Sequence, residues 1–96
     1  MVKIDSTRLA QLCRQHGVAR LRIFGSAATG AMRPDSDVDL IADFAVPTGF
    51  FGLIRFEQAL AAFFGRPVDL LTEPGLSPHI RDSILASASV MFDAAA

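Results

Sequence analysis

Two aspartates, Asp37 and Asp39, stand one residue apart at the start of an apolar stretch. In a β-strand, residues i and i+2 point to the same face, so we expect both carboxylates to enter the same space. Two like charges there raise each other's pKa unless a cation lies between them. Carboxylate oxygens at this spacing suit Mg²⁺ or Mn²⁺, which proteins usually bind through one or two carboxylates and the phosphates of a substrate. The pair therefore predicts metal-assisted chemistry on a phosphate compound.

A glycine–serine pair, Gly25 and Ser26, closes the preceding apolar stretch, and ten residues separate it from the first aspartate. Backbone N–H groups of such a turn, together with Gly30 and the serine hydroxyl, are typical means of holding a phosphate. Arg33 and Ser36 are further candidates for phosphate contact, with a surface charge and a turn former as the alternative interpretations. With the aspartates, this turn predicts phosphoryl or nucleotidyl transfer.

Composition limits the other possibilities. The chain has 96 residues, is 51% hydrophobic and carries a net charge of −1, so we expect one folded domain, residues 1–96. No cluster of Lys or Arg supplies the basic surface that a long nucleic acid would need, which argues against such a ligand. The single cysteine, Cys13, fits a packing role and a reducing compartment. No signal peptide or membrane span is evident, so we expect a cytoplasmic protein with no membrane contact.

Apolar periodicity and turn residues predict an alternation of helices and strands. A first helix begins at a cap, Asp5 or Ser6, and Gly17 ends it. The expected elements that follow are a strand at 19–24, a turn or short helix to Gly30, a strand at 38–44, a helix at 50–64, a strand at 68–71, a helix at 78–88 with Ile80, Ile84, Leu85 and Ala88 on its apolar side, and an edge strand at 90–92. This order predicts an α/β (α+β) fold with a small mixed sheet and helices packed on it.

The order of elements also brings distant residues together. If the first two strands pair antiparallel, Gly25 and Ser26 meet the start of the second strand, where the two aspartates lie. The helix at 50–64 allows a parallel crossover, which places the start of the third strand beside them. Asp69 lies near that start, and a charge inside an apolar strand is costly without a partner or a metal. We therefore expect three carboxylates and the turn to converge at one margin of the sheet.

The run from Gly25-Ser26 to Asp37-Val38-Asp39, with Asp69 on a later strand, resembles the signature of the polymerase-β-like nucleotidyltransferases. The small size is most similar to the minimal nucleotidyltransferases (MNT) of that superfamily. The resemblance implies that Asp37 and Asp39 bind Mg²⁺ or Mn²⁺. It also implies that Asp69 shares a metal or acts as a base, and that the Gly-Ser turn holds the β- and γ-phosphates of ATP.

The resemblance further implies a partner. MNT proteins often pair, as antitoxins, with a helical HEPN toxin, and some transfer AMP from ATP to a tyrosine of that toxin. This chain has no tyrosine, so a tyrosine acceptor would come from the partner. A homo- or hetero-oligomer is compatible with this expectation, and transfer to a small molecule is disfavoured because the chain leaves little room for a substrate domain.

One departure from the MNT pattern leaves a second function open. Many MNT sequences have an arginine directly after the Gly-Ser pair, whereas this chain has Ala27 and Ala28. Fewer cations then face the triphosphate. The leading interpretation is a Mg²⁺-dependent nucleotidyltransferase that acts on a partner protein. The alternative is a module of the same fold that neutralises a HEPN partner by contact alone.

Overall fold

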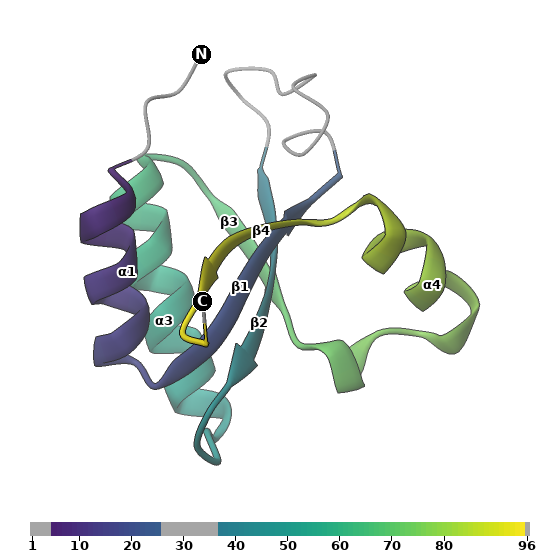
Figure 1. Cartoon of the computed structure of the whole chain (residues 1–96), viewed down its shortest axis with the longest axis horizontal. Helices are drawn as coiled ribbons and strands as arrows, with labels where there is room; N and C mark the ends of the chain where they lie inside the picture. The colour runs from purple at the N-terminus through teal and green to yellow at the C-terminus, as the bar shows by residue number, and fades with distance from the viewer. Residues whose placement is uncertain (1–4, 26–36, 96) are drawn as a thin grey trace.

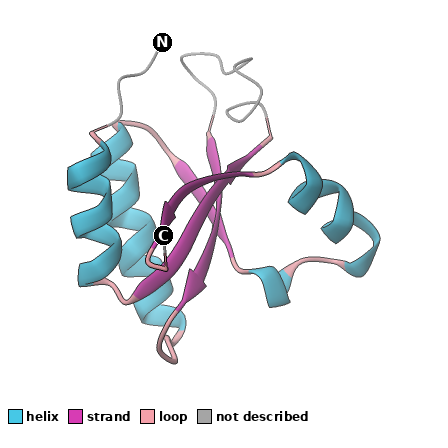
Figure 2. Cartoon of the chain, in the orientation of Figure 1, coloured by secondary structure: helices cyan, strands magenta, loops and turns pink. Residues whose placement is uncertain are grey.

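Four strands form one mixed sheet in the computed structural model, which describes residues 5–25 and 37–95 (Figures 1 and 2). The strand order is β3-β2-β1-β4. The strands are β1 (Val18–Phe24), β2 (Val38–Phe44), β3 (Val68–Leu71) and β4 (Ser89–Asp93). The helices are α1 (Ser6–Gln15), α3 (Phe50–Phe64), α4 (Pro78–Ser87) and a 3₁₀ turn, η1 (Glu73–Gly75). Apart from η1, the sequence predicts every one of these elements.

The pairing of the strands confirms the expected topology. Strand β1 pairs antiparallel with β2 and with β4, and β2 pairs parallel with β3. Helix α3 makes the crossover between the two parallel strands, which need a long connection of this kind. The end of β1 and the starts of β2 and β3 therefore lie at the same end of the sheet.

Helices α1 and α3 lie side by side on one face of the sheet and enclose the hydrophobic core (Figure 1). Asp5 caps α1, because its side chain accepts hydrogen bonds from the N–H groups of Thr7 and Arg8. Gly65, at φ 70°, ends α3 in a left-handed conformation that glycine adopts without strain. The largest fully buried side chains are Phe56, Leu9, Leu21, Leu40, Ile41, Leu60, Val38 and Cys13. Burying each of the larger ones contributes about 1.5–3 kcal/mol.

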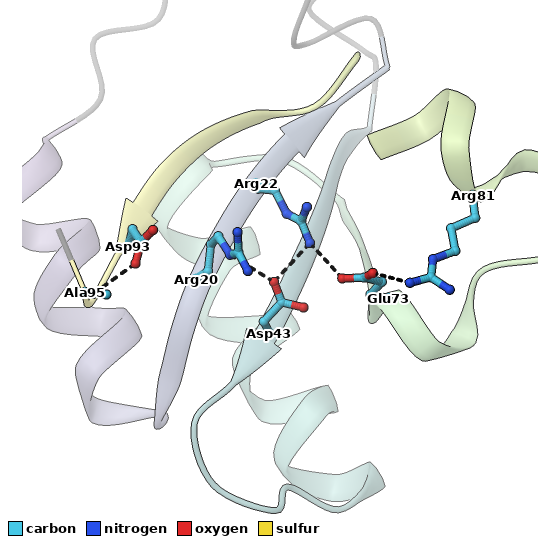
Figure 3. Close-up of polar contacts among 7 residues, drawn as sticks. All are labelled: Arg20, Arg22, Asp43, Glu73, Arg81, Asp93 and Ala95. Atoms are coloured by element: carbon cyan, nitrogen blue, oxygen red, sulfur yellow. Dashed lines mark hydrogen bonds and ion pairs between the residues drawn. The ribbon is translucent and has the colours of Figure 1, made fainter. Parts of the chain in front are cut away.

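The opposite face of the sheet carries charged side chains under α4 and η1 (Figure 3). Arg22 of β1 donates to Asp43 of β2 at 3.0 Å and to Glu73 of η1 at 3.2 Å. Arg81 of α4 contacts Glu73 at 2.5 Å, and Arg20 contacts Asp43 at 3.4 Å. These five residues form the charge network that joins α4 to the sheet.

Helix α4 differs from the sequence expectation in its packing. Ser77 caps it by accepting a hydrogen bond from the His79 N–H. However, no α4 residue is buried, and the structure describes the whole helix. Its apolar side does not join the hydrophobic core, and the sheet face towards it carries the charged side chains of Arg22 and Asp43. No helix within residues 5–25 and 37–95 is long and apolar enough to cross a membrane.

Candidate functional site

The close approach of Gly25 to Asp39 defines the centre of the site. Phe24, the last residue of β1, is the register partner of Asp39 on β2, so the next residue passes the aspartate side chain. Gly25 has φ 71°, and a Cβ added to it would lie 2.8 Å from Asp39 Oδ2. Only glycine therefore leaves room for this carboxylate and also adopts the turn conformation without strain.

Asp69 lies on β3, which flanks β2 on the side away from β1. The two aspartates are register partners in the parallel pair of β2 and β3. The start of this ladder is fixed by a hydrogen bond from the Val38 N–H to the Pro67 carbonyl, at 3.0 Å. Since directly paired residues share a face of a sheet, both carboxylates project to the side of the sheet that carries the charge network.

Electrostatics place the third carboxylate in the same group. The pKa of Asp39 is raised above its usual value, mainly because partial burial disfavours the charged form. The negative charges of Asp69 and Asp37 raise this pKa further. Asp37 and Asp69 are exposed, and Asp39 is half-buried between them. The structure thus brings together Gly25, Asp37, Asp39 and Asp69, as the strand order predicts.

A divalent cation fits this donor set. A cation would relieve the repulsion among these three carboxylates, and two of them, Asp37 and Asp69, are exposed. Within the part of the chain that the structure describes, no three acidic, His or Cys side chains form a preformed cage for a metal ion. Mg²⁺ is typically bound by one or two carboxylates and substrate phosphates rather than by such a cage. Asp39 and its two neighbours therefore suit a cation that arrives with a nucleotide.

The rest of the expected phosphate-binding set is not tested by the structure. Ser26, Gly30, Arg33 and Ser36 lie outside the described residues, as do the alanines that follow Ser26. Their roles remain predictions from the sequence.

Sequence reasoning missed one residue next to the site. Glu57 of α3 accepts a hydrogen bond from the Leu70 N–H, at 3.2 Å, directly beside Asp69. Its only signal in the sequence is that it is the single acidic residue of a largely apolar helix, and such a residue is usually solvated. The spacing of Arg20 and Arg22 in β1 places them on one face of the strand, but the sequence does not indicate that Asp43 and Glu73 are their partners.

Comparison with known proteins agrees with this geometry. A model of the nucleotidyltransferase domain family matches residues 7–90. Protein adenylyltransferase MntA of Thermococcus cleftensis is 33% identical over 75 residues, which are 78% of this chain and 76% of that protein. A solved structure named provisionally as a minimal nucleotidyltransferase is 37% identical, with a TM-score of 0.77 over 88% of this chain and 86% of that one.

A further solved structure shares the fold at low sequence identity. It contains the tri-AMPylated HEPN toxin of Shewanella oneidensis in complex with an MNT antitoxin. The TM-score is 0.68 at 16% identity, and the match covers 94% of this chain and 71% of that chain. The family match, the similar relatives and the convergence of the three aspartates lead to one assignment. This chain belongs to the nucleotidyltransferase domain family and is an enzyme of its minimal nucleotidyltransferase branch.

Proposed function

We propose that this protein transfers AMP from ATP to a hydroxyl group of a partner protein, with Mg²⁺ or Mn²⁺ held by its aspartates. The observation that carries the proposal is the position of Asp39, between the close-packed Gly25 turn and its register partner Asp69. Asp37 adds a third carboxylate within electrostatic reach. Asp37 and Asp69 are exposed, so the acceptor side chain of another protein can approach them.

The reaction is an in-line displacement. The acceptor oxygen forms a bond to the α-phosphorus of ATP, the bond from that phosphorus to the β-phosphate oxygen breaks, and pyrophosphate leaves. The hydroxyl proton passes to a carboxylate, for which Asp69 is the exposed candidate. Asp37 and Asp39 would hold the cation, which when bound would neutralise charge on the phosphates and the leaving group. The Gly25 turn brings its backbone towards the phosphates, so catalysis rests mainly on positioning and charge.

The proposed partner is a helical toxin of the HEPN type, with this chain as its antitoxin. Support comes from the relative named as a protein adenylyltransferase and from the fold shared with an MNT antitoxin seen with its AMPylated HEPN toxin. The absence of tyrosine from this chain means that a tyrosine acceptor must belong to the partner. The absence of a basic stripe from the sequence argues against a nucleic-acid acceptor.

Calorimetry with ATP and Mn²⁺ tests the binding half of the proposal. We expect Asp39→Asn to weaken metal-dependent nucleotide binding at least about 10-fold, since loss even of an outer partner of a metal ligand costs that much. Asp82→Asn, an equal change of charge on the exposed surface of α4, is the matched control and should bind like the wild type. Equal binding by wild type and Asp39→Asn would contradict the proposed site.

Neutralisation of the partner by contact alone is the second candidate. The observation that favours it is the presence of Ala27 and Ala28 where many MNT sequences have basic residues. The two functions differ in one measurable respect, because contact alone leaves the partner unmodified and is indifferent to the aspartates.

A further inference from the structure

Strand β3, which carries Asp69, is an edge strand with one open side. Among the described strands it pairs only with β2, as the strand order β3-β2-β1-β4 shows. On an edge strand, every second backbone N–H points away from the sheet and lacks a partner within it. The Leu70 N–H is bound by a side chain from outside the sheet, which identifies it as one of these groups.

Leu70 is only 5% exposed, so its N–H has little access to water. A buried backbone N–H needs a hydrogen-bond partner, and here the partner is the carboxylate of Glu57, whose Oε2 lies 3.2 Å away. Helix α3 brings Glu57 to this place because its neighbours Phe56 and Leu60 are anchored in the core. An ionised acceptor makes the bond stronger than one between neutral groups.

The bond acts on Asp69 through a single peptide plane. The Leu70 N–H and the Asp69 carbonyl belong to the same planar group, so fixing one fixes the other. This plane restrains the backbone at Asp69, from which its side chain projects, and Asp69 in turn is the register partner of Asp39 in the parallel pair. From this chain of contacts we infer that Glu57 is a positioning residue for Asp69 and sets the geometry of the metal–nucleotide site.

This inference rests on the proposed function, so its test measures binding as well as structure. The probe is ATP with Mn²⁺, titrated by calorimetry into wild type, Glu57→Ala, Asp69→Asn and the double variant. We expect Glu57→Ala to weaken binding by about 10-fold in the wild-type background, the lower end of the range for outer partners of metal ligands. In the Asp69→Asn background the same change should alter binding less than 2-fold, because the residue that Glu57 positions is already lost.

Two further variants separate positioning from folding. Glu57→Gln keeps an acceptor oxygen and should restore binding to within about 3-fold of the wild type, since a neutral hydrogen bond has roughly half the strength of a charged one. Gln58→Ala, at the adjacent exposed position of α3, should leave binding unchanged. Hydrogen exchange should accelerate at the Leu70 amide in Glu57→Ala and remain slow at the Leu21 amide in the core.

The possible failures are distinguishable. If Asp69→Asn binds like the wild type, the assigned role of Asp69 is wrong, and the inference about Glu57 is wrong with it. If Asp69→Asn binds weakly but Glu57→Ala binds normally, or weakens binding equally in both backgrounds, only the positioning role is overturned. The positioning role is also overturned if Glu57→Gln fails to restore binding although the thermal stability of this variant matches that of the wild type.

Discussion

Gly25 and Asp39 are packed so closely that a single methyl group on the glycine would lie 2.8 Å from the aspartate Oδ2. Real Cβ atoms essentially never come so near to another heavy atom, so either the turn or the carboxylate would have to move. The glycine that ends β1 and the aspartate on β2 are therefore one structural unit, although the segment between them lies outside the described residues.

Gly25→Ala should abolish metal-dependent nucleotide binding and lower stability. The left-handed φ of 71° costs a non-glycine residue about 1–2 kcal/mol, and displacement of Asp39 would remove the proposed central metal ligand. Gly65→Ala is the matched control, because Gly65 has φ 70° and nothing within 4 Å of an added Cβ. Urea unfolding should show similar losses for both variants, whereas calorimetry with ATP and Mn²⁺ should show lost binding only for Gly25→Ala. Normal binding by Gly25→Ala would contradict the proposed geometry.

Asp39→Asn should raise the melting temperature in the presence of a chelator. The folded pKa of Asp39 lies above its usual value, because burial and the charges of Asp69 and Asp37 disfavour its ionised form. A carboxyl group with a raised folded pKa destabilises the fold increasingly as pH rises from its ordinary pKa through its folded pKa. At pH 7 the neutral amide of the Asp39→Asn variant removes this unfavourable negative charge. The gain in melting temperature should vanish below pH 3.8, the ordinary pKa of an aspartate. A lower melting temperature at pH 7 would show that the carboxylate is stabilised rather than strained.

Glu73 should contribute to stability at neutral pH and lose that contribution in acid. Hydrogen bonds from Arg81, and then from Arg22, hold the pKa of Glu73 below its ordinary value of 4.5. A lowered folded pKa gives stability that is present above the ordinary value and is lost as pH falls through the folded one. The difference in urea midpoint between wild type and Glu73→Gln should be largest near pH 7 and shrink below pH 4.5. A difference independent of pH would exclude the charge of Glu73 as its cause.

Cys13 should be unreactive in the folded protein. Burial in the core raises the pKa of its thiol to about 11, and only the thiolate is a good nucleophile. A thiol reagent at pH 8 should modify the unfolded chain in urea rapidly and the native protein at least 100-fold more slowly. This factor follows from a thiolate fraction of roughly 1 in 1,000 and from exclusion of the reagent by packing. Equal rates in the two states would place Cys13 outside the core.

The sequence predicts the parts of this fold that depend on local patterns. The bounds of α3 and β3 agree with the prediction because Gly49 and Gly65 delimit the helix and apolar residues fill the strand. The meeting of Asp39 with Asp69 also follows from strand order, since a parallel crossover leaves few alternatives.

What the sequence does not show depends on side chains from distant elements. The periodicity of α4 indicates an apolar side, but not that the sheet beneath carries Arg22 and Asp43. In the same way, Glu57 has the appearance of a solvated residue until the edge position of β3 reveals an N–H in need of a partner. Such contacts come from tertiary packing and leave no local pattern.

The most direct test of AMP transfer is the mass of the partner protein after incubation with this chain, ATP and Mg²⁺. The partner to be tested is the protein encoded beside this chain, and mass spectrometry would show whether an adenylyl group has been added. If this chain transfers AMP as proposed, the wild type and the Asp82→Asn control should both add this mass to the partner. The Asp37→Ala and Asp39→Ala variants should add none. Inhibition of the partner by wild type and both aspartate variants alike, with no change of mass, would contradict the proposed AMP transfer and establish neutralisation by contact.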